Sequence, residues 1–280
     1  MTASSKIWLV TGSSRGLGRA IVETLLEAGQ RVAATARKPE QLQDLVDRYG
    51  DRLLNLPLDV ANQASCGAIV RQTIAQFGCI DFLVNNAGYG DLAAVEDVML
   101  DAFKAQIDTN FFGVVYMSKA VLPYMREQGA GHIFQISSIG GRIGSPGLSA
   151  YQSAKWAVGG FSTVLAQEVA PLGIKVTVME PGGMRTDWAG SSMSIPPVSA
   201  PYEPTVGAMA QMLRAYAGKE PTDPSKVARL LMEVAEMEQA PIRLLVGEDA
   251  VQYAAAAGKA LAESDAEFRH FSESVAWEQR

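Results

Sequence analysis

The sequence predicts an α/β protein with a Rossmann-like fold, in which helices cover both faces of one doubly wound parallel sheet. Short apolar runs suited to buried strands alternate with amphipathic stretches suited to helices along most of its 280 residues. Strands that alternate with helices form βαβ units, and right-handed crossovers between these units build a parallel sheet. One such series accounts for the chain and no second core is visible, so we expect a single domain.

Seven strands are expected in order along the chain, because seven short apolar runs have the length and composition of buried strands. They are Ile7–Thr11, Arg31–Ala36, Leu53–Leu58, Phe82–Asn85, His132–Ser137, Lys175–Glu180 and Arg243–Val246. Six helices are expected around them, because the intervening stretches repeat apolar residues at helical spacing. They are Gly16–Ala28, Gln41–Arg48, Gln63–Phe77, Asp101–Glu127, Ala150–Val169 and Ser225–Glu236.

Two stretches do not follow this alternation. Residues 184–219 contain four prolines, and a long irregular insertion in a compact domain is usually functional. We expect a lid here, with a surface excursion of no function as the alternative. Residues 248–280 contain an alanine run and a charged tail, which predict a helical appendage. The apolar residues of the expected lid are Trp188, Met193, Ile195, Tyr202, Met209 and Met212.

The composition excludes several classes of protein. Hydrophobic residues make up 48% of the chain and charged residues 19%, which excludes a mainly disordered protein. Its 24 basic and 30 acidic residues give a net charge of −6, so we expect no nucleic-acid partner and no attraction to anionic membranes. No uncharged apolar run approaches the ~18 residues of a membrane span, and the apolar block after residues 1–6 is too short for a signal peptide. We therefore expect a cytoplasmic protein.

The cysteines and histidines indicate no metal site. Cys66 and Cys79 are expected to be buried small side chains, because two cysteines in a chain of this size do not suggest a disulfide framework. His132 and His270 are the only histidines in the sequence, and no Cys/His cluster with ligand spacing is present. We expect neither bound metal nor a histidine base.

A glycine-rich turn follows the first expected strand and leads directly into the first expected helix. Glycines at such a turn expose backbone N–H groups to a phosphate without a Cβ in the way, and the helix N-terminus adds a favourable dipole. The spacing Gly-x-x-x-Gly-x-Gly differs from the commoner Gly-x-Gly-x-x-Gly pattern. A merely tight turn is the alternative to nucleotide binding. The cofactor-binding residues expected in the turn are Gly12, Ser14, Arg15, Gly16, Leu17 and Gly18.

The end of the second expected strand carries no acidic residue to bind the adenosine ribose hydroxyls. It reads Ala36-Arg37-Lys38. Arg37, together with Arg15 of the glycine turn, suits a 2′-phosphate through charge-assisted hydrogen bonds. The sequence therefore predicts NADP(H) as the cofactor. The alternative is that both arginines are solvated surface charges.

Two polar positions follow the third and fourth expected strands. Asp59 can accept hydrogen bonds from the adenine amino group, and its interpretation as the N-cap of the next helix is equally favoured. Asn86 stands in Asn85-Asn86-Ala87-Gly88, where small residues let a cofactor approach the backbone. Further along, Asn110 lies among apolar residues and must satisfy its amide.

A serine, a tyrosine and a lysine form the candidate catalytic group. Tyr151 and Lys155 are four residues apart on an expected helix, so their side chains share one face. A neighbouring ammonium favours the phenolate and lowers the tyrosine pKa from about 10, which suits general acid–base chemistry. Ser138 directly follows the fifth expected strand, thirteen residues before Tyr151, and Ser137 is the alternative for the same role.

Together these motifs resemble the short-chain dehydrogenase/reductase family over Lys6 to Gly247. The residues that carry the resemblance are Thr11-Gly12-x-x-x-Gly16-x-Gly18, Asn85-Asn86-Ala87-Gly88, Asn110, Ser138, Tyr151-x-x-x-Lys155 and Pro181-Gly182 followed by Thr186. The stretch Gly182 to Trp188, with Gly247 to Ala250, resembles the NADP-preferring branch that is related to 17β-hydroxysteroid dehydrogenases. No steroid substrate follows from that branch resemblance.

The resemblance implies a role for each motif. Tyr151 would be the catalytic acid/base and Ser138 would hold the substrate oxygen. Lys155 would bind the nicotinamide ribose and tune Tyr151, and Asn110 would anchor a water in the proton relay. Pro181, Gly182 and Thr186 would flank the nicotinamide, while Asp59 and Asn86 would contact the adenosine. The cofactor-binding set beyond the glycine turn is then Arg37, Asp59, Val60, Asn86, Ala87, Gly88, Tyr151, Lys155, Pro181, Gly182 and Thr186.

The function expected from these residues is hydride transfer between NADP(H) and a secondary alcohol/ketone pair, as in carbonyl reductases. Residues 1–247 would form the dinucleotide-binding and catalytic domain, with its lid at 184–219, and residues 248–280 the appendage. One alternative is a non-catalytic NADP(H)-sensing regulatory protein, although the candidate catalytic group is intact. A nucleotide-sugar epimerase or dehydratase would need a larger C-terminal domain.

The apolar residues of the expected lid and of two expected helices predict the kind of substrate and the oligomeric state. The lid residues predict a small-molecule carbonyl or alcohol substrate that is bulky and apolar. The helices expected at 101–127 and 150–169 are apolar on more than one side, which predicts a homodimer or homotetramer. A tail that covers this surface and leaves a monomer is the alternative. The apolar residues concerned are Phe111, Phe112, Val115, Met117, Trp156, Val158, Phe161 and Val164.

Overall fold

A computed structural model of the chain describes residues 5–190 and 192–277. Its sheet has the strand order β3-β2-β1-β4-β5-β6-β7, and all neighbouring strands pair in parallel. The predicted α/β, Rossmann-like doubly wound sheet is therefore confirmed. Three stretches lie outside the described residues. They are residues 1–4 at the N-terminus, residue 191 of the expected lid and residues 278–280 of the expected appendage.

The strands agree closely with the expected ones. They are β1 (Ile7–Thr11), β2 (Arg31–Ala36), β3 (Leu53–Pro57), β4 (Phe82–Asn85), β5 (Gly131–Ile136), β6 (Ile174–Pro181) and β7 (Arg243–Val246). The helices of the described residues follow in the same order along the chain. They are α1 (Gly16–Glu27), α2 (Gln43–Tyr49), α3 (Gln63–Phe77), α4 (Leu100–Ile107), α5 (Gly113–Gln128), α6 (Ser149–Val169), α7 (Ala208–Tyr216), α8 (Pro224–Glu236), α9 (Glu248–Glu267) and α10 (Arg269–Glu273).

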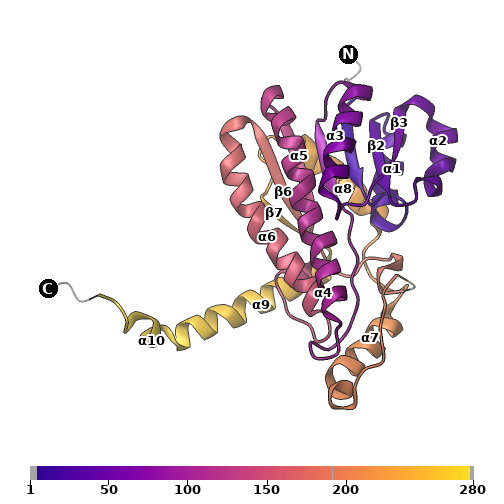
Figure 1. The fold of residues 1–280 in the computed structure, drawn as a ribbon. Coiled ribbons are helices and arrows are strands. Elements are labelled where there is room, and N and C mark those ends of the chain that lie inside the picture. Colours follow the sequence, from indigo (N-terminus) through magenta and orange to yellow (C-terminus); the bar gives the residue numbers. More distant parts are fainter. Residues whose placement is uncertain (1–4, 191, 278–280) are drawn as a thin grey trace.

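Two core layers hold the helices on the sheet. Side chains of a strand point alternately to the two faces, and β1 illustrates this. Trp8 and Val10 pack with α1, α2 and α8 on one face, while Ile7 and Leu9 pack with α3, α5 and α6 on the other. Both faces are apolar because a parallel sheet is covered by helices on each side (Figure 1).

The strand order places a crevice at the ends of β1 and β4. From β1 the chain proceeds outward to β2 and β3, and it then returns to β4 on the other side of β1. The connections after β1 and β4 therefore diverge, and ligands of doubly wound sheets bind at such a switch point.

Two segments extend from this core. The lid segment with α7 lies beyond the carboxyl ends of the strands, and α9 extends away from the body, with α10 at its far end (Figure 1). Ala250 is the buried residue of α9. Among the described residues, no helix has the length and apolar character needed to span a bilayer.

Candidate functional site

A cavity of about 690 Å³ lies at the crevice, and residues from every part of the predicted site except Asn110 line it. The predicted residues that line it are Gly12, Ser14, Arg15, Gly16, Leu17, Gly18, Arg37, Asp59, Val60, Asn86, Ala87, Gly88, Ser138, Tyr151, Lys155, Pro181, Gly182 and Thr186. The glycine turn and the tyrosine–lysine helix, which are far apart in sequence, thus open onto one space.

The glycine turn has a geometry that only small residues allow. Gly12 has φ +68°, and an added Cβ would lie 2.7 Å from Ala87 Cα. An added Cβ on Gly18 would lie 2.1 Å from the Gly12 carbonyl oxygen. The residue before α1, Arg15, provides no side-chain cap, and the first turn of α1 carries no acidic residue. The N–H groups at this helix end therefore lack a side-chain cap, which fits a phosphate.

Asn86 ties the loop after β4 to the glycine turn. Its Nδ2 donates to the Thr11 and Gly12 carbonyl oxygens, at 3.0 Å each, and its main-chain N–H donates to Thr11 Oγ1 at 3.0 Å. The side-chain amide is therefore used to hold the turn in place. The adenosine contact that the resemblance implies for Asn86 stays a prediction.

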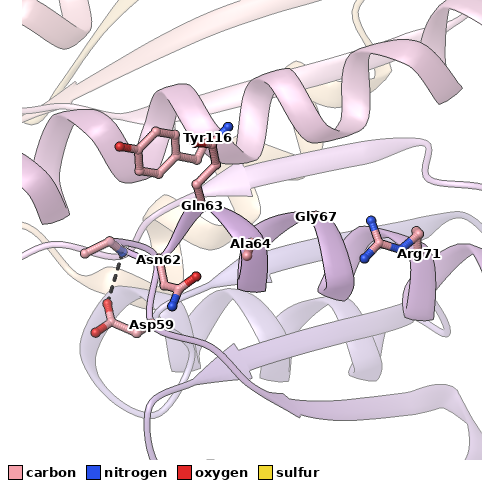
Figure 2. Close-up of a pocket in the computed structure, with 8 residues that line it drawn as sticks. Asp59, Asn62, Gln63, Ala64, Gly67, Arg71 and Tyr116 are labelled. Carbon is pink, nitrogen blue, oxygen red and sulfur yellow. Dashed lines mark hydrogen bonds between the residues drawn. The ribbon is translucent and has the colours of Figure 1, made fainter.

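Asp59 lies in the loop that follows β3, at the edge of a second, more open hollow of about 870 Å³ beside α3 (Figure 2). Its Oδ1 accepts a hydrogen bond from the Ala61 N–H at 3.0 Å. The N-cap of α3 is Asn62, whose Oδ1 accepts from Ser65 N–H at 3.0 Å. The interpretation of Asp59 as this N-cap is therefore wrong. Its other carboxylate oxygen makes no hydrogen bond within the described residues, and the side chain lines the main cavity.

Arg15 and Arg37 both line the cavity and both are exposed. Neither forms an ion pair with a carboxylate in the part of the chain that the structure describes. Ala36, at the position where a carboxylate would repel a 2′-phosphate, is buried and neutral. Arg15 and Arg37 thus bring two positive charges to a cavity lining that also contains Asp59 and Asp108.

Tyr151 and Lys155 lie on α6 and are both buried. Burial raises the pKa of Tyr151 to about 12, and a hydrogen bond with Ser138 opposes this rise. Burial lowers the pKa of Lys155 to about 8. The expectation that the ammonium lowers the tyrosine pKa is therefore wrong for the free protein, because loss of hydration dominates for both groups.

Ser138 and Ser137 have different environments. Ser138 Oγ accepts from Gly140 N–H at 3.0 Å and lines the cavity beside Tyr151. Ser137 Oγ instead donates to the Lys155 carbonyl oxygen at 3.2 Å and is buried. The geometry favours Ser138 for contact with a substrate, and Ser137 fixes the strand end to α6.

Lys155 and Glu180 connect the site to the sheet. Lys155 Nζ donates to the Ile136 carbonyl oxygen at 2.7 Å. The Glu180 carboxylate is fully buried and accepts from Arg142 Nε at 2.8 Å and from Arg243 Nε at 2.9 Å. Because Arg142 follows the turn that begins at Ser138, this carboxylate fixes that turn to β6 and β7.

Asn110 lies in a π-helical turn, Asp108–Phe112, that separates α4 from α5. The single helix expected over 101–127 is therefore interrupted. Asn110 is fully buried, and its amide both accepts from Tyr89 N–H at 3.0 Å and donates to the Tyr89 carbonyl oxygen at 2.8 Å. An added Cβ on Gly88 would lie 2.5 Å from Asn110 Oδ1. Asn110 thus holds the loop beside the cavity, and its implied relay role stays a prediction.

Most apolar residues of the expected lid anchor it to the body. Four of the six apolar residues named for the expected lid pack into a third core cluster with Leu92 and Leu148 and do not line the cavity. These four are Met193, Ile195, Tyr202 and Met209. Trp188 and Met212 line the cavity, and the Trp188 ring lies 5.0 Å from the Tyr151 ring centre.

The cavity also contains residues that the predicted site did not include. Glu220 follows α7, Asp249 lies in the first turn of α9, and both line the cavity together with Tyr216 and Tyr253. Glu220 and Asp249 lie 69 and 98 residues beyond Tyr151, Glu220 between two helices and Asp249 in the C-terminal part of the sequence. An isolated carboxylate in such sequence resembles any surface carboxylate, so only the fold reveals it.

Comparison with known proteins agrees with this geometry. The family model described as short chain dehydrogenase matches residues 6–194. Oxidoreductase BOA17 of Botryotinia fuckeliana is 58% identical over 269 residues, which are 96% of this chain and 98% of that protein. A short-chain dehydrogenase from Streptomyces avermitilis has a TM-score of 0.92 and 36% identity, and the match covers 99% of this chain and 100% of the other.

A second solved structure is the closed form of a serine dehydrogenase complexed with NADP+. Its TM-score is 0.75 and its identity 30%, over 86% of this chain and 94% of the other. The family model spans the strands from β1 to β6 together with the helix of Tyr151 and Lys155, and the match to a relative that is 58% identical covers nearly the whole chain. The chain therefore belongs to the short-chain dehydrogenase/reductase family of nicotinamide-dependent oxidoreductases.

Proposed function

We propose that the protein interconverts a ketone and a secondary alcohol with NADP(H), in the manner of a carbonyl reductase. The observation that carries this proposal is that Ser138, Tyr151 and Lys155 line the same cavity as the glycine turn with Arg15 and Arg37. The bound nicotinamide cofactor supplies or accepts the hydride. The residues of the chain supply orientation and the proton.

Tyr151 is the proposed proton donor for ketone reduction. With a pKa of about 12 in the free protein, its phenol is protonated at neutral pH and can donate. Ser138, whose hydroxyl is hydrogen-bonded to Tyr151 in the free protein, is the proposed donor of a second hydrogen bond to the substrate oxygen as negative charge develops there. Lys155 lies one helical turn away, with its ammonium group 5.7 Å from the centre of the Tyr151 ring, and is the proposed ligand of the nicotinamide ribose.

Arg15 and Arg37 are the proposed ligands of the 2′-phosphate of NADP(H). Similar folds have been solved with NADP+ and with NAD, so the preference rests on the residues of this chain. No ion pair within the described residues occupies either guanidinium, and no carboxylate stands at Ala36 to repel a phosphate. The backbone at Gly12 and Gly16, with φ of +68° and +54°, leaves room for the diphosphate.

The substrate is proposed to be a small carbonyl or alcohol compound with a bulky apolar part. Trp188, Met212, Leu213 and Tyr216 line the cavity and come from the lid segment, and the Trp188 ring lies beside Tyr151. Because the segment is anchored by its own core cluster, we propose that residues 184–219 form the substrate lid on the catalytic domain.

Consumption of NADPH tests this function. Purified protein is mixed with NADPH and a series of ketones that increase from acetone to aryl and polycyclic ketones, and the loss of NADPH absorbance is followed. We expect turnover that improves with the size of the apolar group. Turnover of no ketone or aldehyde by the wild-type protein, with NADPH binding intact, would contradict the proposed function and favour a regulatory sensor.

A further inference from the structure

Trp188 belongs to the lid segment and packs on the ring of Tyr151. It lies in a short 3₁₀ turn, Asp187–Ala189, and its main-chain N–H donates to Thr186 Oγ1 at 3.3 Å. Its indole lines the cavity, and its ring centre lies 5.0 Å from that of Tyr151, with the ring planes at 53°. A large ring of the lid is therefore in contact with the ring of the proposed proton donor.

Gly90 provides the space that this contact needs. An added Cβ on Gly90 would lie 2.8 Å from Trp188 Cζ2 and 3.2 Å from Tyr151 Cδ2. Gly90 is not among the glycines with positive φ, so the requirement for glycine here is space and not a left-handed backbone. Any side chain at this position would press on the indole.

Hydrogen bonds hold the backbone on both sides of Gly90. The Tyr89 main-chain N–H and carbonyl oxygen both bond the buried Asn110 amide, at 3.0 and 2.8 Å. The Asp91 N–H donates to Oε1 of the buried Gln106 at 3.0 Å. Gly90 is thus fixed relative to α4 and the π turn, so a methyl group added there would displace the indole and not the loop.

The indole is also packed from the lid. Trp188 is a partly buried residue that packs against the third core cluster, which contains Leu92 and Leu148. Met212, which lines the same cavity, is by contrast 55% exposed and has a flexible thioether side chain. The cavity therefore has a fixed wall at Trp188 and an adaptable one at Met212.

We propose that Trp188, held in place by Gly90, limits the smaller of the two groups on the substrate carbonyl carbon. This inference rests on the proposed function and specifies its substrate class, which is ketones with one small group and one bulky apolar group. Because the substrate oxygen comes within about 3 Å of the Tyr151 hydroxyl, the groups on its carbon are brought next to the rings that pack on Tyr151. An indole that cannot withdraw admits the small group, and the bulky group then faces Met212.

Aryl ketones of graded size test this limit. Acetophenone, propiophenone and isobutyrophenone share the phenyl group and carry a methyl, an ethyl and an isopropyl group on the other side. We expect the wild-type protein to prefer acetophenone to isobutyrophenone in kcat/KM by about tenfold or more, the usual effect of added carbons in a closed pocket. In Trp188→Ala this ratio should fall to about threefold or less, because isobutyrophenone gains.

The intrinsic reactivity of each ketone cancels when the ratios of two proteins are compared. Trp188→Leu, which is also smaller than tryptophan, is the second test variant if Trp188→Ala does not fold. An unchanged ratio in a folded variant would overturn the proposed limit.

Gly90→Ala tests whether Gly90 positions the indole. We expect it to lower kcat/KM for acetophenone by about tenfold in the wild-type background and by about twofold or less in Trp188→Ala, where the indole is absent. Gly144→Ala is the matched control, because Gly144 does not line the cavity and an added Cβ would meet no described atom beyond its chain neighbours within 4 Å. It should match the wild-type protein. Equal losses from Gly90→Ala in both backgrounds would overturn the role of Gly90.

Binding of unreactive analogues separates this inference from the proposed function. Methyl phenyl sulfoxide and isopropyl phenyl sulfoxide carry an S=O acceptor in place of the ketone and accept no hydride. Each is titrated calorimetrically into the wild-type protein and Trp188→Ala with saturating NADP+. We expect the wild-type protein to bind the methyl compound more tightly by about tenfold or more, and Trp188→Ala to lose this preference.

The two experiments together distinguish the possible failures. If ketones are reduced with the same size ratio by the wild-type protein and Trp188→Ala, the proposed function stands and this inference fails. If no ketone is reduced, yet the wild-type protein prefers the methyl sulfoxide and Trp188→Ala does not, the proposed function fails and the wall at Trp188 stands. If no ketone is reduced and both proteins bind the sulfoxides equally, both proposals fail.

Discussion

The ammonium group of Lys155 lies 5.7 Å from the centre of the Tyr151 ring, one helical turn away on α6. Burial changes the two pKa values in opposite directions, to about 12 for Tyr151 and about 8 for Lys155. Each change favours the neutral form. The free protein therefore holds a protonated phenol beside a lysine whose charge is sensitive to pH near neutrality.

Tyr151→Phe is expected to abolish most of the activity without unfolding the protein. The change removes one hydroxyl and retains the ring, which packs against Trp188. Loss of a general acid typically lowers kcat by about 10²–10⁴-fold. Ketone reduction and NADPH affinity are measured on both proteins. Near-wild-type kcat in Tyr151→Phe would exclude Tyr151 as the proton donor.

The stability of the free protein should rise with pH in a window set by Lys155. The lysine pKa is about 8 when folded and 10.5 ordinarily, so between these values the unfolded chain binds more protons. The free energy of unfolding therefore increases as pH rises through this window. The Lys155→Met protein lacks this group. The difference in the free energy of unfolding between the wild-type protein and Lys155→Met should therefore change by up to about 3 kcal/mol across the window.

Urea denaturation from pH 7.5 to 10 measures this difference. The Cys66 thiol, whose pKa burial raises to about 11, opposes the trend equally in both proteins and cancels. Lys119→Met, at an exposed position of α5, is the control and should follow the wild-type protein. A constant difference between the wild-type protein and Lys155→Met across this range would mean that Lys155 is not shifted.

Glu180→Gln should weaken both stability and catalysis. It removes a fully buried charge and leaves the guanidinium groups of Arg142 and Arg243 without their partner. Both guanidinium groups are about one-third exposed, so the cost is expected at about 3 kcal/mol. Because Arg142 holds the turn after Ser138, we expect kcat to fall more than NADPH affinity. Equal losses in kcat and NADPH affinity would indicate a general structural effect.

The strand positions could be predicted from the sequence, because buried parallel strands are short apolar runs. The location of the cavity could be predicted as well, because the turn after the first strand carries the glycines that suit a phosphate. The π turn at Asn110 could not, since an extra residue in a helical turn leaves the apolar spacing almost unchanged. Asp59 and Asn62 are equally good helix caps in sequence, and only the start of α3 decides between them.

The sequence also could not predict the direction of the Tyr151 pKa shift. Nor could it predict that Glu220 and Asp249 line the cavity. The pKa depends on how completely the fold buries the phenol, which lies against Trp188, and spacing on a helix does not specify that burial. Glu220 and Asp249 both line the cavity, although Glu220 follows α7 and Asp249 lies at the start of α9. Gly182 to Trp188 and Gly247 to Ala250 resemble a branch of the family in sequence, but that resemblance does not specify where the following segments lie.

Self-association is expected through the face formed by the π turn and α6. Phe112, Trp156 and Val164 are 39%, 53% and 56% exposed, and the described tail extends away from the body instead of covering them. Large exposed apolar groups of this kind are typical of interfaces. Light scattering at micromolar concentration should give a multiple of 29.9 kDa, as for a homodimer or homotetramer.

Trp156→Glu should shift this assembly toward the monomer. Leu261→Glu, at an exposed position on α9, is the matched control and should leave the mass unchanged if the tail takes no part. A wild-type mass of one chain would contradict self-association. A loss of mass in Leu261→Glu alone would place the interface on the tail.

The cofactor preference should depend on Arg15 and Arg37. A charge-assisted hydrogen bond contributes about 1.5–3 kcal/mol, and exposure of both arginines reduces this value through hydration and salt screening. We therefore expect NADPH to bind more tightly than NADH by on the order of 10- to 100-fold. Ala36→Asp combined with Arg37→Ser introduces the carboxylate that binds ribose hydroxyls and removes one guanidinium, so it should reverse the preference.

Dissociation constants for NADPH and NADH, measured at two salt concentrations, check this reversal. Arg48→Ser removes an exposed arginine of α2 that does not line the cavity, and it should keep the wild-type ratio. Because the 2′-phosphate contact is electrostatic, the wild-type preference should decrease at the higher salt concentration, whereas NADH affinity should change less. Equal affinities of the wild-type protein for the two cofactors would mean that Arg15 and Arg37 are solvated surface charges.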